Sequence, residues 1–224
     1  MRIRADFSQP VAVDTTALPW QPSPDGSVQR RMLDRIGDEV ARATSIVRYP
    51  PQSRFPAHHH ALGEEFLVLD GVFSDEHADY PAGTYVRNPP GSSHSPHSDG
   101  GCTIFVKLRQ MPEAESRYAR VSADSGKWRN WHGLERLDLF DADYETVFLA
   151  ESGPGERVPL AMTDKGFEML VLAGEIEVDG NPHGALAWLR RPGGTDPGVT
   201  LAPATRLWIK TGHLAPAGGE PQAR

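Results

Sequence analysis

The sequence predicts an all-β chain in which one β-domain occurs twice. It contains 22 glycines and 20 prolines, 42 of 224 residues, against a usual share of about 12%, which indicates many turns. Short apolar or alternating runs that Gly, Pro, Asn or Asp punctuate predict strands at residues 43–49, 65–71, 83–89 and 103–108. Helical periodicity is scarce, and its best candidate, residues 28–43, is interrupted by Gly37 and fits an extended structure equally well.

The two copies of the β-domain are related by an offset of 103 residues. GEEFLVLDG, YVRNPPG and IFVK at residues 63–71, 85–91 and 104–107 align with GFEMLVLAG, WLRRPGG and LWIK at residues 166–174, 188–194 and 207–210. One offset serves about residues 55–107 without a net gap. Three matches at one offset indicate a tandem duplication.

Composition disfavours several classes of protein. The net charge of −7 and the pI near 5.7 repel phosphate, so nucleic acid is not expected as a partner. The single cysteine, Cys102, excludes an internal disulfide framework and CxxC zinc sites and fits a cytoplasmic setting. We expect it to be buried beside the strand at 103–108. No stretch reaches the roughly 18 apolar residues of a membrane span, and no signal peptide is expected.

Three histidines and a glutamate form the candidate metal site. His58 and His60 are two residues apart, so on a strand they share one face with Cα atoms about 6.5–7 Å apart. Both imidazoles can then reach one ion, while His59 points to the other face. Glu64 begins the next strand after a loop, and His94 closes the Gly/Pro-rich turn NPPGSSH.

The second copy lacks all four of these residues. At the same offset His58, His60, Glu64 and His94 face Ala161, Thr163, Phe167 and Pro197. A joint loss suggests a shared role, because residues that only solvate a loop would be lost singly. Glu65, by contrast, persists as Glu168, so we expect it to be a structural hydrogen-bonding residue.

The spacing of these residues resembles the cupin signature. His58-x-His60-(X)3-Glu64-(X)6-Gly71 resembles its first motif, and GTYVRNPPGSSH, which ends at His94, resembles its second. The opening glycine of the first motif is replaced by Ser53 or its neighbours, and the closing asparagine of the second by Ser98. Residues 43–111 closely resemble the cupin domain of ChrR-like proteins, a family named after an anti-sigma factor of the extracytoplasmic-function class.

The resemblance implies a bicupin of two jelly-roll barrels, an active first copy and a degenerate second copy with an apolar interior. It implies a metal held by His58, His60, Glu64 and His94, and a homodimer. ChrR binds its sigma factor through a separate helical zinc domain with an HxxxCxxC motif, which these residues lack. A sigma factor is therefore a disfavoured partner.

The expected organisation has five segments. Residues 1–42 are an extension packing on the barrels, 43–111 the metal-binding cupin, 112–133 a linker, 134–214 the degenerate cupin and 215–224 a flexible tail. Trp128 and Trp131 are expected to anchor the linker on a barrel.

Two functions stay open. One is a regulatory or sensory cupin whose metal binds a small molecule or responds to oxidants. The other is a mononuclear dioxygenase acting on a diketone or phenolic ketone. Zn, Fe, Mn or Ni would suit the ligands, and only an open coordination sphere supports catalysis.

No residue is assigned a catalytic role. Candidate pocket residues are Phe66, Tyr85, Arg87 and Phe105, and His97 is a weaker candidate for contact with the metal.

Overall fold

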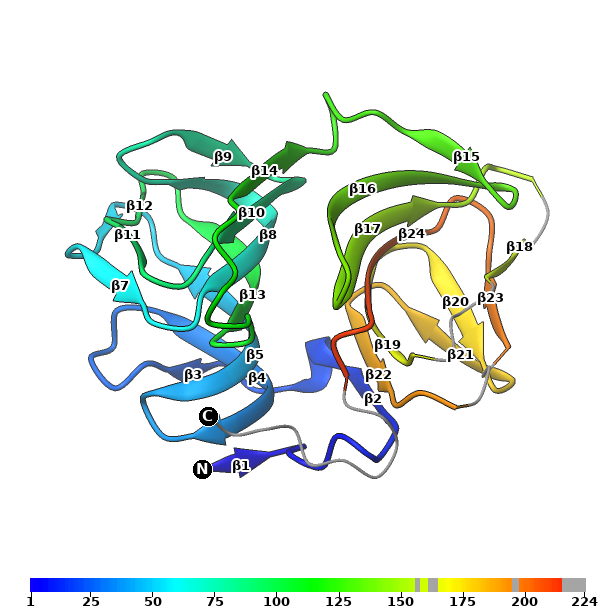
Figure 1. Ribbon diagram of the computed structural model, residues 1–224, viewed down its shortest axis with the longest axis horizontal. Helices are drawn as coiled ribbons and strands as arrows, with labels where there is room; N and C mark the ends of the chain where they lie inside the picture. The colour runs from blue at the N-terminus through cyan, green and yellow to red at the C-terminus, as the bar shows by residue number, and fades with distance from the viewer. Residues whose placement is uncertain (156–157, 161–164, 195–197, 215–224) are drawn as a thin grey trace. The chain divides into compact units, whose positions relative to one another are not determined.

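The chain forms two compact units, each built from β-strands (Figure 1). The computed structural model describes residues 1–155, 158–160, 165–194 and 198–214. Within these ranges the only helical element is the short 3-10 helix η1 (Thr15–Ala17). No helix in the described part of the chain is long and apolar enough to cross a membrane. The all-β prediction is confirmed.

Unit 1 comprises Met1–Ala5 and Pro19–Gly126. Its strands are β1 (Arg2–Ile3), β3 (Gln21–Pro22), β4 (Gln29–Gly37), β5 (Ala41–Tyr49), β6 (Ser53–Arg54), β7 (His58–His60), β8 (Glu64–Ser74), β9 (Asp79–Pro81), β10 (Thr84–Asn88), β11 (Ser92–His94), β12 (His97–Ser98), β13 (Cys102–Leu108) and β14 (Ala119–Ser122). The main sheet has the order β1-β4-β5-β13-β8-β10-β14, and β7 pairs with β11 in a separate two-stranded sheet.

Unit 2 comprises Asp6–Leu18 and Lys127–Arg224. Its strands are β2 (Val11–Asp14), β15 (Arg129–Trp131), β16 (Leu134–Ala142), β17 (Glu145–Glu151), β18 (Val158–Leu160), β19 (Phe167–Ala173), β20 (Glu175–Val178), β21 (Asn181–Gly184), β22 (Ala187–Arg191), β23 (Val199–Leu201) and β24 (Arg206–Thr211). One sheet runs β15-β16-β17-β24-β19-β22-β2, and the other runs β18-β23-β20-β21.

The interiors of the units follow from strand alternation. In unit 1, Phe66 and Val68 of β8 pack with Val86, Ile104 and Val106 from the neighbouring strands. In unit 2 a buried apolar cluster drawn from both sheets includes Phe167 at the position that corresponds to Glu64. The apolar interior expected for the second copy is therefore present. The second-copy equivalents of the three histidines, Ala161, Thr163 and Pro197, lie outside the described residues.

Both copies have a glycine with positive φ at the same position of the central strand, within β8 in unit 1 and between β19 and β20 in unit 2. Gly71 has a φ of +73°, and a Cβ there would lie 2.2 Å from the carbonyl oxygen of Gly101. Its counterpart Gly174 has a φ of +78°, and a Cβ there would lie 2.4 Å from Thr205 Oγ1. A side chain is excluded twice over, by the left-handed backbone and by the close approach.

In each unit the main sheet ends in a short edge strand that comes from outside the expected cupin segment. In unit 1, β14 pairs with β10, and in unit 2, β2 pairs with β22. The registers correspond, since Ser122 lies opposite Thr84 and Asp14 opposite Ala187. Thus β14 and β15 lie within the segment expected to be a linker, and β2 within the expected N-terminal extension.

Residues 28–43 are extended, not helical. They contribute to the hairpin of β4 and β5, whose strands pair from Gln29 opposite Arg48 to Gly37 opposite Ala41. Gly37 has a φ of +113° at the turn, so the glycine that interrupted the helical pattern ends a strand.

Candidate metal centre

Strands β7 and β11 bring three histidines together. The strands are antiparallel, with His58 opposite His94 and His60 opposite Ser92. Since His58 and His60 lie on the same face of β7, the three imidazoles converge, with ring centroids 4.8–5.1 Å apart. Their ligand nitrogens lie within 4.8 Å of one another. These residues could hold a metal ion.

Glu64 joins this group from the start of β8. Its Oε2 lies 3.5 Å from His60 Nε2 and 3.4 Å from His94 Nε2. His60, His94 and Glu64 are buried, whereas His58 is exposed. The structure thus gathers all four residues that the sequence singled out, and one side of the cluster, at His58, is open to solvent.

The hydrogen bonds of two histidines direct their Nε2 atoms into the cluster. Nδ1 of His58 lies 3.2 Å from the carbonyl oxygen of Pro56, and Nδ1 of His94 lies 3.2 Å from Asp75 Oδ2. Because a carbonyl and a carboxylate only accept, each Nδ1 carries a proton, and in the neutral imidazole each Nε2 then keeps its lone pair. This is the tautomer that a metal ligand needs.

Two buried nitrogens at the centre lack a hydrogen-bond partner. Nε2 of His60 and Nε2 of His94 have none in the described part of the chain. Buried polar atoms are nearly always satisfied, so such atoms require an explanation. A cation between these nitrogens and the Glu64 carboxylate would satisfy them. Imidazole and carboxylate donors fit Zn, Fe, Mn and Ni.

Burial and local charge set the pKa values of this cluster. Burial lowers the pKa of His60, although the charge of Glu64 opposes the shift. Burial acts in the same direction on His94, but the hydrogen bond to Asp75 and the charge of Glu64 outweigh it and raise the pKa. Burial raises the pKa of Asp75, yet its hydrogen bonds from His94 and from the backbone N–H groups of His77 and Ala78 bring it down to about 2. Asp75 therefore remains a carboxylate that can accept the proton of His94 Nδ1.

Sequence reasoning missed the side chains that hold the ligands. Asp75, in the turn between β8 and β9, accepts the hydrogen bond from His94. Asn88, at the end of β10, donates from Nδ2 to Glu64 Oε2 at 3.2 Å. The sequence signal for Asn88 is its place at the start of NPPGSSH, the segment that ends at His94. Its position opposite Glu64 comes from the pairing of β10 with β8, which only the structure shows.

The expected pocket residues separate into two groups. Phe66 lies in the interior cluster of unit 1. Tyr85 and Arg87 flank the interior residue Val86 and lie on the opposite face of β10, where both bond to Glu65 Oε2 at 2.5 Å and 3.0 Å. Glu65 thus has the hydrogen-bonding role expected from the sequence.

The same alternation moves Phe105 away from the histidines, because it lies between the interior residues Ile104 and Val106. The structure does not bring Tyr85, Arg87 or Phe105 to the cluster. His59 is exposed on the outer face of β7. His97 lies on β12, opposite Arg54 of β6 and Ser74 of β8, and is outside the three-histidine group.

Two other side chains behave as the sequence indicated. Cys102 is buried in the interior cluster of unit 1. Trp131 packs against the core of unit 2, edge-on to Phe148 with ring centroids 5.4 Å apart.

Comparison with known proteins identifies the fold. Residues 8–112 match the family model of the ChrR cupin-like domain, which confirms the resemblance over that segment. Among curated proteins the sequence has no match.

Solved structures of similar fold are cupin and jelly-roll proteins. A candidate dioxygenase of Nostoc punctiforme has a TM-score of 0.75 and 14% identity, covering 96% of this chain and 85% of its own. The bacterial pirin YhhW of Escherichia coli, in complex with nickel(II), has a TM-score of 0.66 and 11% identity, covering 93% and 100%. A cupin 2 conserved barrel domain protein of Leptotrichia buccalis has a TM-score of 0.59 and 10% identity, covering 93% and 98%. The chain therefore has the bicupin fold of two jelly-roll barrels, of which the second is degenerate.

Proposed function

We propose that this ChrR-like cupin domain holds one divalent metal through His58, His60, Glu64 and His94, and that the metal is the binding point for a small molecule that the protein senses. The convergence of three imidazole nitrogens, two of them buried without a hydrogen-bond partner, carries the proposal. The carboxylate of Glu64 adjoins both of those nitrogens.

The residues around the ligands prepare the site before any metal arrives. Pro56 and Asp75 hold the protons of His58 and His94 at Nδ1. Asn88 fixes one oxygen of Glu64. Low loss of side-chain freedom on binding favours affinity, because the ligands are already placed.

The charge of the donor set indicates the class of small molecule. Three neutral imidazoles and one carboxylate leave a divalent site with a formal charge of about +1, which favours a carboxylate, an enolate or another oxygen anion. Exposed His58 gives access from solvent. Beside the ligands, the Phe73 ring lies 5.8 Å from that of His94 and packs against Phe66 at a centroid distance of 4.5 Å, which supplies an apolar wall. A small anion with an apolar body is the complement of such a site.

A second candidate function is a mononuclear dioxygenase acting on a diketone or phenolic ketone. Support comes from the open side of the cluster, since a six-coordinate ion held by four protein ligands would keep about two positions for substrate and oxygen. The name of the Nostoc neighbour agrees, but at 14% identity that likeness carries the fold alone.

Metal content of the full chain, purified without added metal or chelator, tests the proposal. Elemental mass spectrometry is expected to find about one divalent ion per chain. A chelator should remove this ion, and dialysis against the same metal should restore it. Zinc with no oxygen uptake on diketones and catechols would support the sensory function, whereas iron, manganese or nickel with substrate-dependent uptake would support the dioxygenase. A chain that neither carries nor takes up a divalent ion would overturn the metal site.

A further inference from the structure

A closed ring of polar contacts surrounds the proposed metal site, and two of the ligands belong to it. The polar ring, as we term it, consists in order of Glu64, His94, Asp75, Tyr80, Arg120 and Asn88. Five of its links are hydrogen bonds. The sixth is the 3.4 Å approach of Glu64 Oε2 to His94 Nε2, which is where a metal would lie.

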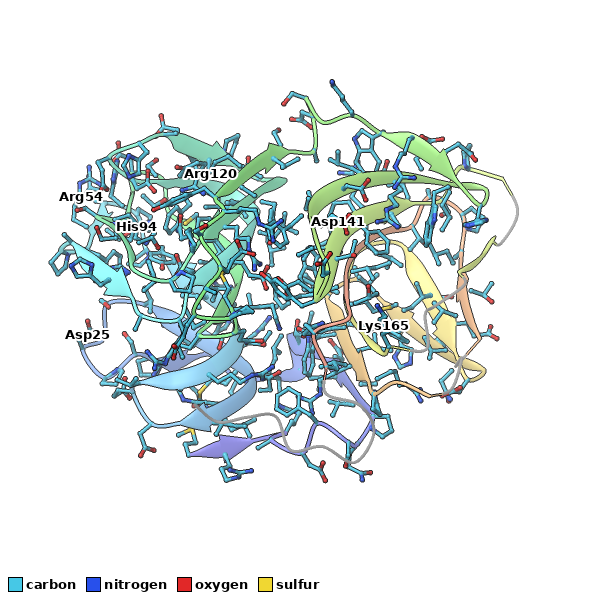
Figure 2. The ribbon with its side chains drawn as sticks, viewed as in Figure 1. Asp25, Arg54, His94, Arg120, Asp141 and Lys165 are labelled. Carbon is cyan, nitrogen blue, oxygen red and sulfur yellow. The ribbon has the colours of Figure 1, made fainter. Side chains whose placement is uncertain are left out.

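Arg120 lies opposite the two ligands in the polar ring. It projects from the edge strand β14, where it pairs with the interior residue Val86 of β10. Nη2 donates to Asn88 Oδ1 at 2.7 Å, and Nε donates to the Tyr80 hydroxyl at 3.2 Å. Figure 2 shows Arg120 on β14 and His94 on β11, both within unit 1.

One arm of the polar ring runs from Arg120 to Glu64. Arg120 only donates, so it requires the carbonyl oxygen of Asn88 to face it. The amide nitrogen must then face the other way, and it donates to Glu64 Oε2 at 3.2 Å. Without Arg120 the amide could turn over and place its oxygen against the carboxylate. Arg120 thereby fixes which group meets the carboxylate ligand.

The other arm runs from Arg120 to His94. The Tyr80 hydroxyl accepts from Arg120, which leaves its own proton for Asp75 Oδ1 at 3.2 Å. The second oxygen of Asp75 accepts the proton of His94 Nδ1 at 3.2 Å. A fixed direction of donation along this arm therefore keeps the lone pair of His94 Nε2 turned towards Glu64.

The guanidinium of Arg120 is committed to the protein. Nη1 donates to the carbonyl oxygens of Arg87 and Ala119 at 2.7 Å and 2.8 Å. With the bonds from Nε and Nη2, four of its five N–H groups are in use. Its chemistry is that of a clamp between strands β14 and β10, and a role in binding an anionic ligand would require breaking these bonds.

We propose that Arg120 is the positioning residue of the metal centre, acting on Glu64 through Asn88 and on His94 through Tyr80 and Asp75. This inference rests on the proposed metal site. It assigns a role in that site to a residue of the segment between the two cupin copies, on a strand that contributes no ligand.

Zinc affinity of the full chain, measured by competition with a chromogenic chelator, is the first test. Arg120→Gln is expected to weaken binding about tenfold, the lower end of the 10–100-fold loss seen when a hydrogen-bond partner of a ligand is removed. Arg120→Lys should also weaken it, because one ammonium cannot serve both arms in the fork geometry. Arg117→Gln is the control, since it removes the same charge from a side chain that bonds Glu115. Equal affinity of the Arg120→Gln and Arg117→Gln chains, or full affinity with lysine at 120, would overturn the proposal.

Nitrogen-15 NMR of the histidine side chains tests the same inference without metal. At about pH 9 the imidazoles are neutral, and His94 of the wild-type chain is expected as the Nδ1–H tautomer alone. Arg120→Gln, and Tyr80→Phe as a second variant, should give a mixture of tautomers, while Arg117→Gln should not. An unchanged tautomer in both variants would sink the His94 arm even if affinity fell. If the wild-type chain binds no zinc, the metal site fails, and the tautomers still decide whether Arg120 positions His94.

Discussion

The two barrels have the same strand register and different interiors. Glu65 and Glu168 occupy equivalent positions, and each accepts a hydrogen bond from an aromatic side chain one strand away, Tyr85 at 2.5 Å and Trp188 at 2.8 Å. Where the first barrel has Glu64, the second has Phe167 in an apolar cluster. Residues that both copies keep maintain the sheet, and residues that only one copy has form the proposed metal site.

Placing the first barrel's carboxylate in the second should produce the largest effect. Phe167→Glu places a buried charge in a cluster whose described members are apolar, which costs about 3–5 kcal/mol of the free energy of unfolding. Phe167→Leu, which keeps the site apolar, should cost less than about 2 kcal/mol. Urea denaturation measures both. A Glu variant as stable as the Leu variant would show that this interior tolerates charge, and the contrast between the barrels would fail.

Removing a ligand from the first barrel should have the next largest effect. His60→Ala is expected to lower the affinity for a divalent metal by more than about 100-fold, beyond the range for residues that merely support a ligand. That factor corresponds to about 2.7 kcal/mol. His59→Ala is the matched control, because His59 lies on the outer face of the same strand. Equal losses, measured by chelator competition, would contradict the assignment of the two faces.

Cysteine reactivity sharpens the comparison at another pair of positions, Cys102 and its counterpart Thr205. Burial raises the pKa of the Cys102 thiol to about 11, against the opposing hydrogen bond of Ser98. At pH 8 the native thiolate is then about 100-fold scarcer than at the ordinary pKa of 9. We expect alkylation of the native chain to be slower than that of the urea-unfolded chain by about this factor.

The sign of the linked stability follows from the same shift. The folded state disfavours the thiolate of Cys102. The contribution of the protonated Cys102 thiol to the free energy of unfolding is therefore fully present below pH 9 and is lost as the pH rises towards 11. Equal alkylation rates for native and unfolded protein would show that Cys102 is accessible.

Loss of one shared hydrogen bond should have the smallest effect of the four. Tyr85→Phe removes the hydroxyl that donates to the buried Glu65 and should cost about 2 kcal/mol of unfolding free energy. Metal affinity should not change, because Tyr85 lies on the face opposite the histidines. Tyr118→Phe, at a side chain 61% exposed, should be nearly neutral. A loss of metal affinity with Tyr85→Phe would blur the separation between residues for the fold and residues for the site.

The duplication could be read from the sequence because one offset relates three separate segments. The grouping of the four site residues could be read because their spacing resembles the cupin signature. His58 and His60 share a face by alternation alone. The positions of Tyr85, Arg87 and Phe105 could not be read, because inward and outward faces of β10 and β13 depend on their register with β8. Alternation counted from Glu64 predicts which side chains face inward on β8 alone, and not on β10 or β13.

Arg120 and Asp75 were missed for a different physical reason. Asp75 lies in a turn, where side-chain direction follows local hydrogen bonds and has no period. Arg120 lies on a four-residue edge strand, too short for an alternating pattern to stand out in a polar segment. Such a strand is defined by its partner, here β10, which lies outside the polar segment.

Strand β2 lies near the start of the chain and pairs with β22 near its end, which has a consequence for the order of events during synthesis. Val11 pairs with Arg190, about 180 residues later, so at the usual 5–20 residues per second the ribosome needs about 10–35 s to deliver its partner. Strand β14, in contrast, emerges soon after β10 and can complete the first barrel at once. During that interval β2 is a strand without a ladder, exposed to chaperones, to proteases and to the same strand of a neighbouring nascent chain. A strand made near the start of synthesis is thus among the last to be paired, because its place in the second sheet exists only once β22 has been made.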